Sequence, residues 1–470
     1  MNDLSMRGHK LRGYVSHGGD LRSGKITPRT YLEETLTRIA QLDKTIGAFV
    51  VVNRDGALKA ARAADRARAK KKRLGPLHGV PITIKENIAT KGVPVPLGTA
   101  ATDLVPAADD APASARVREA GAVILAKTTM PDYGMLSSGL SSLHGVTRNP
   151  WRLDRNPSGS SSGAAAAAVA GYGPLHIGTD IGGSVRLPAT HCGLFALKPS
   201  LGRVPIHPPY MGRVAGPMTR SVEDAALLLD VIARPDARDF MSLPPPGKNF
   251  RGGLDALDPK GISIGFIAEM GAGLMVHPEV RAAAHAAAAA LEAAGCRVEP
   301  VRSFLTEEML DGVCRFFEAR SHNDFVQLSE ARRARVLPFV AEWCTWRAAE
   351  FSGRDVMQAY SQVMAMREAA VAATARHDFL LSPTSPILAY EAELPAPGDD
   401  PHNALPHIAF TVPYNMSEQP AASVNWSYST AGLPIGVQVI GRRFDDAGVL
   451  KLCRLIETLR PPQRDWPEPR

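Results

Sequence analysis

The chain has few cysteines among its 470 residues, and they match no pattern typical of a metal site or a disulfide framework. All five lie far apart, and no two of them form a CxxC pair. An odd, scattered set predicts reduced thiols, no structural zinc and a cytoplasmic location. No apolar run reaches the ~20 residues that a membrane span requires, and no signal-peptide stretch opens the chain. We therefore expect a soluble cytoplasmic protein that does not associate with membranes.

Aromatic residues are also scarce, at 6% of the chain. Their scarcity bears on the net charge of +7, much of which comes from the run RARAKKKR at 66–73. Proteins that bind single-stranded nucleic acid interleave aromatic rings with such basic residues, and this run contains none. It is typical of the solvated face of a helix. We expect no nucleic-acid partner.

What the sequence does contain is one stretch, 156–199, with two Gly/Ser loops separated by an Ala-rich segment typical of a buried helix. The second loop, within GTDIGGSVR, has two glycines directly before Ser184. Adjacent glycines allow consecutive N–H groups to point at one place, where they stabilise an anion. Ser184 would then attack a carbonyl whose oxygen becomes negative beside these groups. The first loop supplies more hydroxyls, those of Ser158, Ser160, Ser161 and Ser162.

A serine nucleophile needs a base, because the free hydroxyl is weakly nucleophilic at neutral pH. Lys85 ends the β-branched run GVPITIK, and a strand there would carry its side chain into the interior. A desolvated lysine loses its preference for the charged form and can act as a base. Lys127 ends a second apolar run, AVILAK, and the residue pattern does not separate these two candidates.

The segments GVPITIKEN, NPSGSSSG and GTDIGGSVRLPA together resemble the amidase signature family of Ser-Ser-Lys hydrolases. The similarity continues through GLFALKPS, PMTRSVEDAALLLDV, SPTSP and GLPIGVQVIG, so it covers nearly the whole chain. One departure is that the usual GGSS opening reads SGSS here. The resemblance implies Ser184 as nucleophile, Ser160 as the bridging serine after a cis peptide bond, and Lys85 as the base, with Lys127 structural. It further implies an oxyanion hole of four backbone N–H groups, those of Ile181, Gly182, Gly183 and Ser184, supported by Ser161, Asp180 and Arg186.

The reaction implied by the resemblance is acyl transfer from a linear amide without metal or cofactor. Neutral Lys85 would take a proton from Ser160, which takes one from Ser184, and Ser184 would attack the carbonyl carbon. Esters and carbamates present a similar carbonyl and are further candidate substrates. The expected partners are a small-molecule amide substrate and, as one option, a second copy of the chain in a homodimer.

The residues that bind this substrate are predicted from position. The irregular segment 128–150 lies between the Lys127 strand and the first Ser loop, which makes Met130, Asp132, Tyr133 and Met135 candidates. In the resembling family, the mainly helical stretch at about 305–376 often caps the active site. Its rings favour an aryl or otherwise apolar amide, such as an anilide or a carbamate, and belong to Phe316, Phe317, His322, Phe325, Trp343 and Trp346.

The alternation of apolar strands and helical segments predicts an α/β fold. With the resemblance, we expect a single large domain over 1–470, with a mixed central β-sheet flanked by helices on both faces. A loose arm at about 1–25 is expected before the first helix, which begins at Thr27 and Pro28 and runs to Leu42. The Pro/Gly-rich connector at about 234–260 is expected to join parts of the same sheet.

Three other interpretations remain open at this stage. The pattern GxSxG makes Ser161 a candidate α/β-hydrolase nucleophile, with His144, His176 or His191 as its base, but the preceding WRLDRNP lacks the required strand. A glutaminase-type subunit of a tRNA-dependent amidotransferase fits the same resemblance, although no acidic and basic pair is clearly placed for free glutamine. A non-catalytic binding homologue is the third, and the joint presence of Lys85, Ser160 and Ser184 opposes it.

Overall fold

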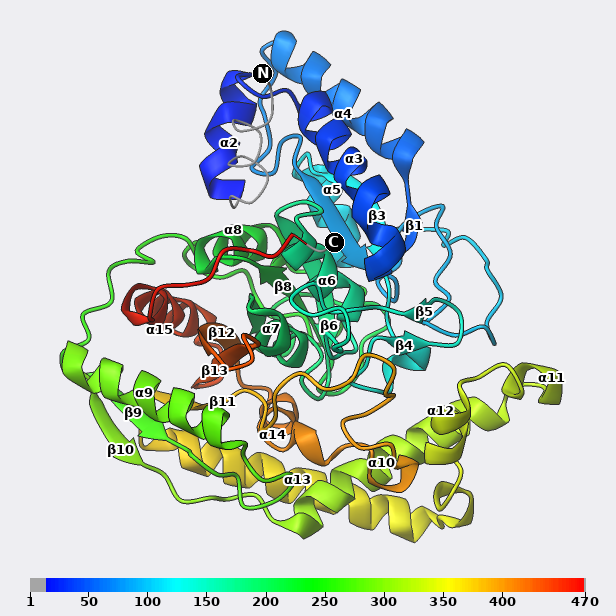
Figure 1. The fold of residues 1–470 in the computed structure, drawn as a ribbon, viewed down its shortest axis with the longest axis vertical. Helices are drawn as coiled ribbons and strands as arrows, with labels where there is room; N and C mark the ends of the chain where they lie inside the picture. Colours follow the sequence, from blue (N-terminus) through cyan, green and yellow to red (C-terminus); the bar gives the residue numbers. More distant parts are fainter. Residues whose placement is uncertain (1–13, 469–470) are drawn as a thin grey trace.

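The computed structural model describes residues 14–468, which are arranged around one mixed sheet of eleven strands (Figure 1). In spatial order the strands are β1 (Phe49–Val52), β3 (Val123–Thr128), β2 (Pro81–Lys85), β6 (Leu175–Asp180), β8 (Val214–Thr219), β7 (Phe195–Lys198), β12 (Ala421–Tyr428), β13 (Pro434–Gly441), β11 (Phe379–Pro383), β9 (Ser263–Phe266) and β10 (Arg297–Pro300). A separate two-stranded sheet joins β4 (Leu140–Ser141) to β5 (Gly145–Val146).

The sheet combines two parallel parts with an antiparallel centre. Strands β3, β2 and β6 are parallel near one end, where β1 adds an antiparallel edge, and β11, β9 and β10 are parallel at the other end. The pairs from β6 to β8, β7, β12, β13 and β11 are antiparallel. The expected α/β fold with a mixed central sheet is confirmed, and the strands on both sides of the 234–260 connector belong to this one sheet.

Helices cover both faces of the sheet, as the alternation along β7 illustrates. Ala196 packs in a cluster with α6 and α7, whereas its neighbour Leu197 packs in the larger cluster with α8 and α15. Successive strand residues point to opposite faces, so these clusters lie on opposite sides. The helices are α2 (Tyr14–Ser23), α3 (Pro28–Ile46), α4 (Arg54–Ala69), α5 (Pro112–Glu119), α6 (Ser162–Ala170), α7 (Arg186–Cys192), α8 (Val222–Ile232), α9 (Pro278–Ala294), α10 (Glu307–Val326), α11 (Glu330–Arg333), α12 (Pro338–Trp343), α13 (Gly353–Ala375), α14 (Val412–Met416) and α15 (Asp446–Leu459).

The N-terminal segment differs from the loose arm expected at 1–25. Residues 1–13 lie outside the described part of the chain, and residues 14–23 form helix α2. This helix is anchored because Leu21 is fully buried in the main core and Arg22 donates to the Pro76 carbonyl at 3.4 Å. The sequence pattern around Leu21 is too weakly apolar to indicate that contact. Helix α3 begins at the expected Thr27 cap but continues past Leu42, to Ile46.

The stretch 305–376 is helical as expected and contributes α10 to α13. Helices α10 and α13 pack against each other, and Figure 1 shows them as two long helices at the lower side of the molecule. Within residues 14–468, no helix combines the length and the apolar character needed to cross a bilayer. The cytoplasmic location remains a prediction.

Candidate active site

Lys85 is the last residue of β2, which lies between the parallel neighbours β3 and β6. All five residues of this strand are buried, because it is covered on both faces, and the Lys85 side chain is fully enclosed. Burial lowers the pKa of Lys85 to about 7, against the opposing attraction of Asp180 and Glu86. A substantial fraction of this amine is therefore neutral at physiological pH.

The first Ser loop meets this amine directly. Lys85 Nζ donates to Ser160 Oγ at 2.8 Å and to Ser161 Oγ at 3.1 Å. The peptide bond between Gly159 and Ser160 is cis. Ser161 Oγ also donates to the Thr179 carbonyl at 3.2 Å, which ties this loop to the end of β6. The structure thus places Lys85 and both predicted hydroxyls in one hydrogen-bonded group.

The second loop follows β6 and carries Ser184. Gly183 has a φ of 131°, and a Cβ there would lie 2.5 Å from Thr411 Oγ1, so the position requires glycine. The Ser161 N–H donates to the Ser184 carbonyl at 3.2 Å and joins the two Ser loops. Ser184 is 9% exposed and lines a pocket. Lys85, Ser160 and Ser184 therefore lie in adjoining parts of one site, although their catalytic roles remain predictions.

A buried ion pair supports the Ser184 loop. Arg186 is fully buried and binds Asp180 through two contacts, Nε to Oδ2 at 3.1 Å and Nη2 to Oδ1 at 3.0 Å. The remaining guanidinium hydrogens reach the Thr411 carbonyl, Gln438 and Asn415. Burial opposes ionisation of Asp180, but Arg186 and the hydrogen bonds around it hold the Asp180 pKa well below its usual range. This network fixes the loop between the end of β6 and the start of α7.

The four N–H groups predicted as an oxyanion hole differ in availability. The Gly183 N–H donates to Asp180 Oδ1 at 2.8 Å, so a carboxylate already occupies it. For Ile181, Gly182 and Ser184, no loop or side-chain acceptor contacts the N–H within the described residues. These three are the candidates that remain free to face an oxyanion.

The pocket beside Ser184 is mainly apolar and is built from several separate parts of the chain. Its lining residues are Gly134, Met135, Leu136, Ser137, Ile181, Gly182, Ser184, Phe317, Arg320, Trp343, Leu405 and Ile408. No carboxylate side chain is among these described residues. Phe317 from α10 and Trp343 from α12 bring the predicted cap region into contact with the site.

Of the four substrate-binding candidates, the structure brings only Met135 to this pocket. Met130 is buried and does not line it, and Tyr133 packs in a separate apolar cluster with Leu337. Asp132 is buried with both carboxylate oxygens occupied: Oδ1 accepts from the Ser142 N–H, and Oδ2 accepts from the Ser142 hydroxyl and the Leu337 N–H. Asp132 therefore holds its own loop to Ser142 and to the Leu337 backbone, and its side chain does not line the pocket.

The other rings of the cap lie away from Ser184. Phe316 packs on Tyr360, and His322 Nδ1 contacts the Cys344 carbonyl at 3.1 Å. Phe325 packs near Leu328, while Trp346 is 39% exposed and stacks on His402. Sequence analysis missed Arg320, Leu405 and Ile408 as lining residues. No local signal marks them, since only the packing of α10 and the 405–408 turn brings them to the pocket.

Neither rival arrangement, Lys127 as the base or Ser161 with a histidine, is formed by the described residues. Lys127 donates to the Ile88 carbonyl and to Thr90 Oγ1, away from both Ser loops, although burial also lowers its pKa to about 7. No described histidine contacts Ser161 Oγ. The three candidate histidines have other contacts, His144 with Glu86, His176 with Thr83 and the Gly173 carbonyl, and His191 with Ser385.

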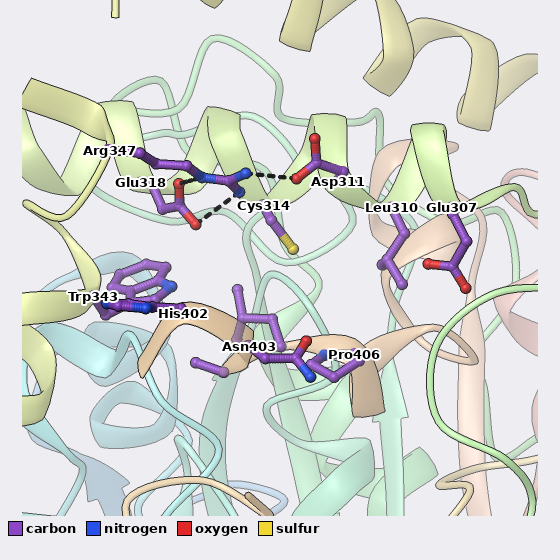
Figure 2. Close-up of a pocket in the computed structure, with 12 residues that line it drawn as sticks. Glu307, Leu310, Asp311, Cys314, Glu318, Trp343, Arg347, His402, Asn403 and Pro406 are labelled. Carbon is purple, nitrogen blue, oxygen red and sulfur yellow. Dashed lines mark hydrogen bonds and ion pairs between the residues drawn. The ribbon is translucent and has the colours of Figure 1, made fainter. Parts of the chain in front are cut away.

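A second pocket adjoins the first and shares Trp343 and Leu405 with it. Figure 2 shows that Arg347 in this second pocket points between two carboxylates of α10. Its guanidinium donates to Glu318 at 2.6 and 3.0 Å and to Asp311 at 2.8 Å. This cation is therefore neutralised by its neighbours, unlike the guanidinium in the Ser184 pocket.

Comparisons with known proteins match this chain over most of its length. Residues 30–450 match the family model described as Amidase. A curated relative, a glutamyl-tRNA(Gln) amidotransferase subunit from Symbiobacterium thermophilum, is 35% identical over 92% of this chain and 93% of its own. Among solved structures, a bacterial aryl acylamidase of the amidase signature family is 28% identical, with a TM-score of 0.88 and 96% of both chains covered. A peptide amidase from Stenotrophomonas maltophilia is 27% identical, with a TM-score of 0.82, over 96% of this chain and 97% of its own.

Proposed function

The chain belongs to the amidase signature family and so is an enzyme acting on C–N bonds, and on this premise we propose that it hydrolyses linear amides with an apolar acyl group. The observation that carries the proposal is the Ser184 pocket, whose lining is mainly apolar and, in the described residues, free of carboxylates. Anilides and aryl carbamates fit such a pocket. Esters are expected side substrates, because they form the same tetrahedral oxyanion.

The proposed mechanism uses the contacts around Lys85. Neutral Lys85 takes the proton of Ser160, Ser160 takes that of Ser184, and Ser184 Oγ attacks the amide carbon. The N–H groups of the Ser184 loop stabilise the oxyanion. Ser160 and Lys85 then return a proton to the leaving amine, which departs as the acyl-enzyme forms. Water repeats the sequence on the acyl-enzyme and releases the acid.

A second candidate is a glutaminase-type amidotransferase subunit, and the curated relatives favour it. Free glutamine carries an ammonium and a carboxylate, and the described lining of the Ser184 pocket offers Arg320 but no acidic partner for the ammonium. Burying an unpaired ammonium is costly. This composition supports the hydrolase over the amidotransferase component.

A substrate panel tests the choice between these functions. The purified chain is expected to turn over the 4-nitroanilide of an apolar acid with a kcat/KM roughly 100-fold or more above that for glutamine, because the ammonium lacks a partner. Release of 4-nitroaniline and of ammonia measures the two reactions. Glutamine turnover that equals or exceeds anilide turnover would instead support the amidotransferase function.

The pH dependence of kcat/KM is a second test. Protonated Lys85 cannot accept a proton, so kcat/KM is expected to rise as pH increases through about 7 and to level off above it. Well below pH 7 the fall is about tenfold per pH unit. Lys127→Met is the matched control, because Lys127 has a similar lowered pKa but contacts neither Ser loop. A rise that disappears in a folded Lys127→Met protein would show that the titration does not belong to Lys85.

A further inference from the structure

The Ser184 pocket contains a cation that has no counter-ion among the residues that the structure describes. Arg320 on α10 is half-buried and lines this pocket, and its Nε is buried without a hydrogen-bond partner. No ion pair joins Arg320 to any described carboxylate, including Asp324 one turn further along α10. A buried guanidinium N–H without an acceptor is unfavourable, and the rest of this half-buried group has no ion-pair partner among the described residues.

A second guanidinium makes the local excess of positive charge larger. Arg320 Cζ lies 5.2 Å from the ring centre of Tyr210, and Arg213 Cζ lies 5.6 Å from the same ring. Burial lowers the pKa of Arg213, and the charge of Arg320 lowers it further. Two cations at one ring gain some cation–π attraction but repel each other. An anion bound near Arg320 would relieve the repulsion and could accept the unpaired Nε hydrogen bond.

The carboxylate that acts on Arg213 already accepts two backbone hydrogen bonds. Asp239, which acts on Arg213, accepts from the Ile206 N–H at 2.9 Å and from the Met241 N–H at 2.9 Å. In the adjoining pocket Arg347 has two carboxylate partners (Figure 2). Arg320 thus differs from the other pocket arginine in having its acceptors still to be supplied.

We propose that Arg320 selects amide substrates that carry a carboxylate on an otherwise apolar acyl group and that carry no ammonium. This inference rests on the proposed amide hydrolysis and names its substrate class. A planar guanidinium binds a carboxylate through paired, charge-assisted hydrogen bonds, which gives both affinity and orientation. Arg213, at the same tyrosine ring, adds to the attraction. The apolar lining accommodates the chain between the carboxylate and the amide.

Two anilides that differ in one terminal group, a carboxylate or a methyl, test the proposal. N-(4-nitrophenyl)succinamate has a terminal carboxylate, and N-(4-nitrophenyl)butyramide is its neutral counterpart. The parent protein is expected to favour the anionic anilide in kcat/KM by roughly 10- to 100-fold. Arg320→Met keeps an unbranched stem against Tyr210 and Phe317, and in this variant the ratio falls toward one. Arg320→Lys retains the charge and keeps part of the preference.

Arg315→Met is the matched control. Arg315 lies on the same helix and pairs with Asp311, so this variant loses one charge outside the Ser184 pocket. The preference ratio of Arg315→Met is expected to equal that of the parent. Equal turnover of the two anilides by the parent, or an equal loss of preference in both variants, would overturn the role of Arg320.

Binding separates this inference from the hydrolysis itself. The Ser184→Ala protein, with and without the additional change Arg320→Met, is titrated calorimetrically with N-phenylsuccinamate and with N-phenylbutyramide. Tighter binding of the anion that depends on Arg320 supports the inference even if no anilide is cleaved, in which case only the proposed hydrolysis fails. Equal affinity for the two compounds overturns the inference, whatever the parent protein hydrolyses.

Discussion

Ser184→Ala is expected to lower anilide turnover by roughly 10⁴- to 10⁶-fold, which is the scale seen when a hydrolase loses its nucleophile. The variant removes a single oxygen just before α7, and the backbone contact between Ser161 and Ser184 stays in place. The protein should therefore fold and bind substrate as before. Single-turnover release of 4-nitroaniline, together with circular dichroism of the variant, measures the loss and checks the fold.

Ser162→Ala is the control for Ser184→Ala. Ser162 belongs to the same serine-rich stretch, but among the described residues its hydroxyl makes a single long contact of 3.5 Å, with the Thr129 carbonyl. Its activity is expected to stay within about twofold of the parent, since the loss of one weak hydrogen bond away from the reacting atoms has a small effect. If Ser184→Ala keeps parent-like turnover, Ser184 is not the nucleophile and the acyl-enzyme mechanism fails.

Arg186→Met is expected to lower the free energy of unfolding by about 3–5 kcal/mol, because it leaves the buried Asp180 carboxylate without its cation. Methionine replaces much of the side-chain volume but none of the hydrogen bonds to Thr411, Gln438 and Asn415. Activity should fall as well, since Asp180 also holds the Gly183 N–H. Urea unfolding of the parent and the variant measures the difference.

Two further variants test whether the stability loss in Arg186→Met comes from the unpaired buried charge. The double variant Asp180→Asn with Arg186→Met removes the uncompensated charge and is expected to lose less stability than Arg186→Met alone. Arg29→Met removes an exposed arginine paired with Glu33, and no measurable loss is expected there. An Arg186→Met protein as stable as Arg29→Met would show that the buried pair does not hold the Ser184 loop.

The comparisons and the pocket favour different members of the same family. Curated relatives include amidotransferase subunits, whereas solved structures of similar shape include an aryl acylamidase and a peptide amidase. Overall similarity follows the fold as a whole, which these proteins share. Substrate choice depends on a few lining side chains, and Arg320 and Ile408 are two that contact the space beside Ser184 here. The anilide and glutamine measurements therefore decide between the two functions more directly than sequence identity to the relatives does.

Some features of this protein are determined by short segments of sequence. A β-branched run followed by lysine predicts a buried strand that ends in a desolvated amine, and Lys85 on β2 is such a residue. The Gly183 position requires a conformation that other residues rarely adopt, so its role can be read from the GGS pattern. The family and the mixed sheet follow from several such segments taken together. The Lys85 strand and the Gly183 turn each depend on residues that are neighbours in the chain.

Other features were decided only by the tertiary structure. Strands β6, β7, β8 and β12 lie between β2 and β13, and their places in the sheet depend on pairing between segments that are distant in the chain. Asp132 turned inward while Met135 reached the pocket, because the partners of Asp132 include Leu337, which is distant in the chain. Arg320 comes from α10 and Ile408 from a distant turn. Their meeting at Ser184 depends on how α10 and that turn pack, and long-range packing leaves no periodic signal in the sequence around either residue.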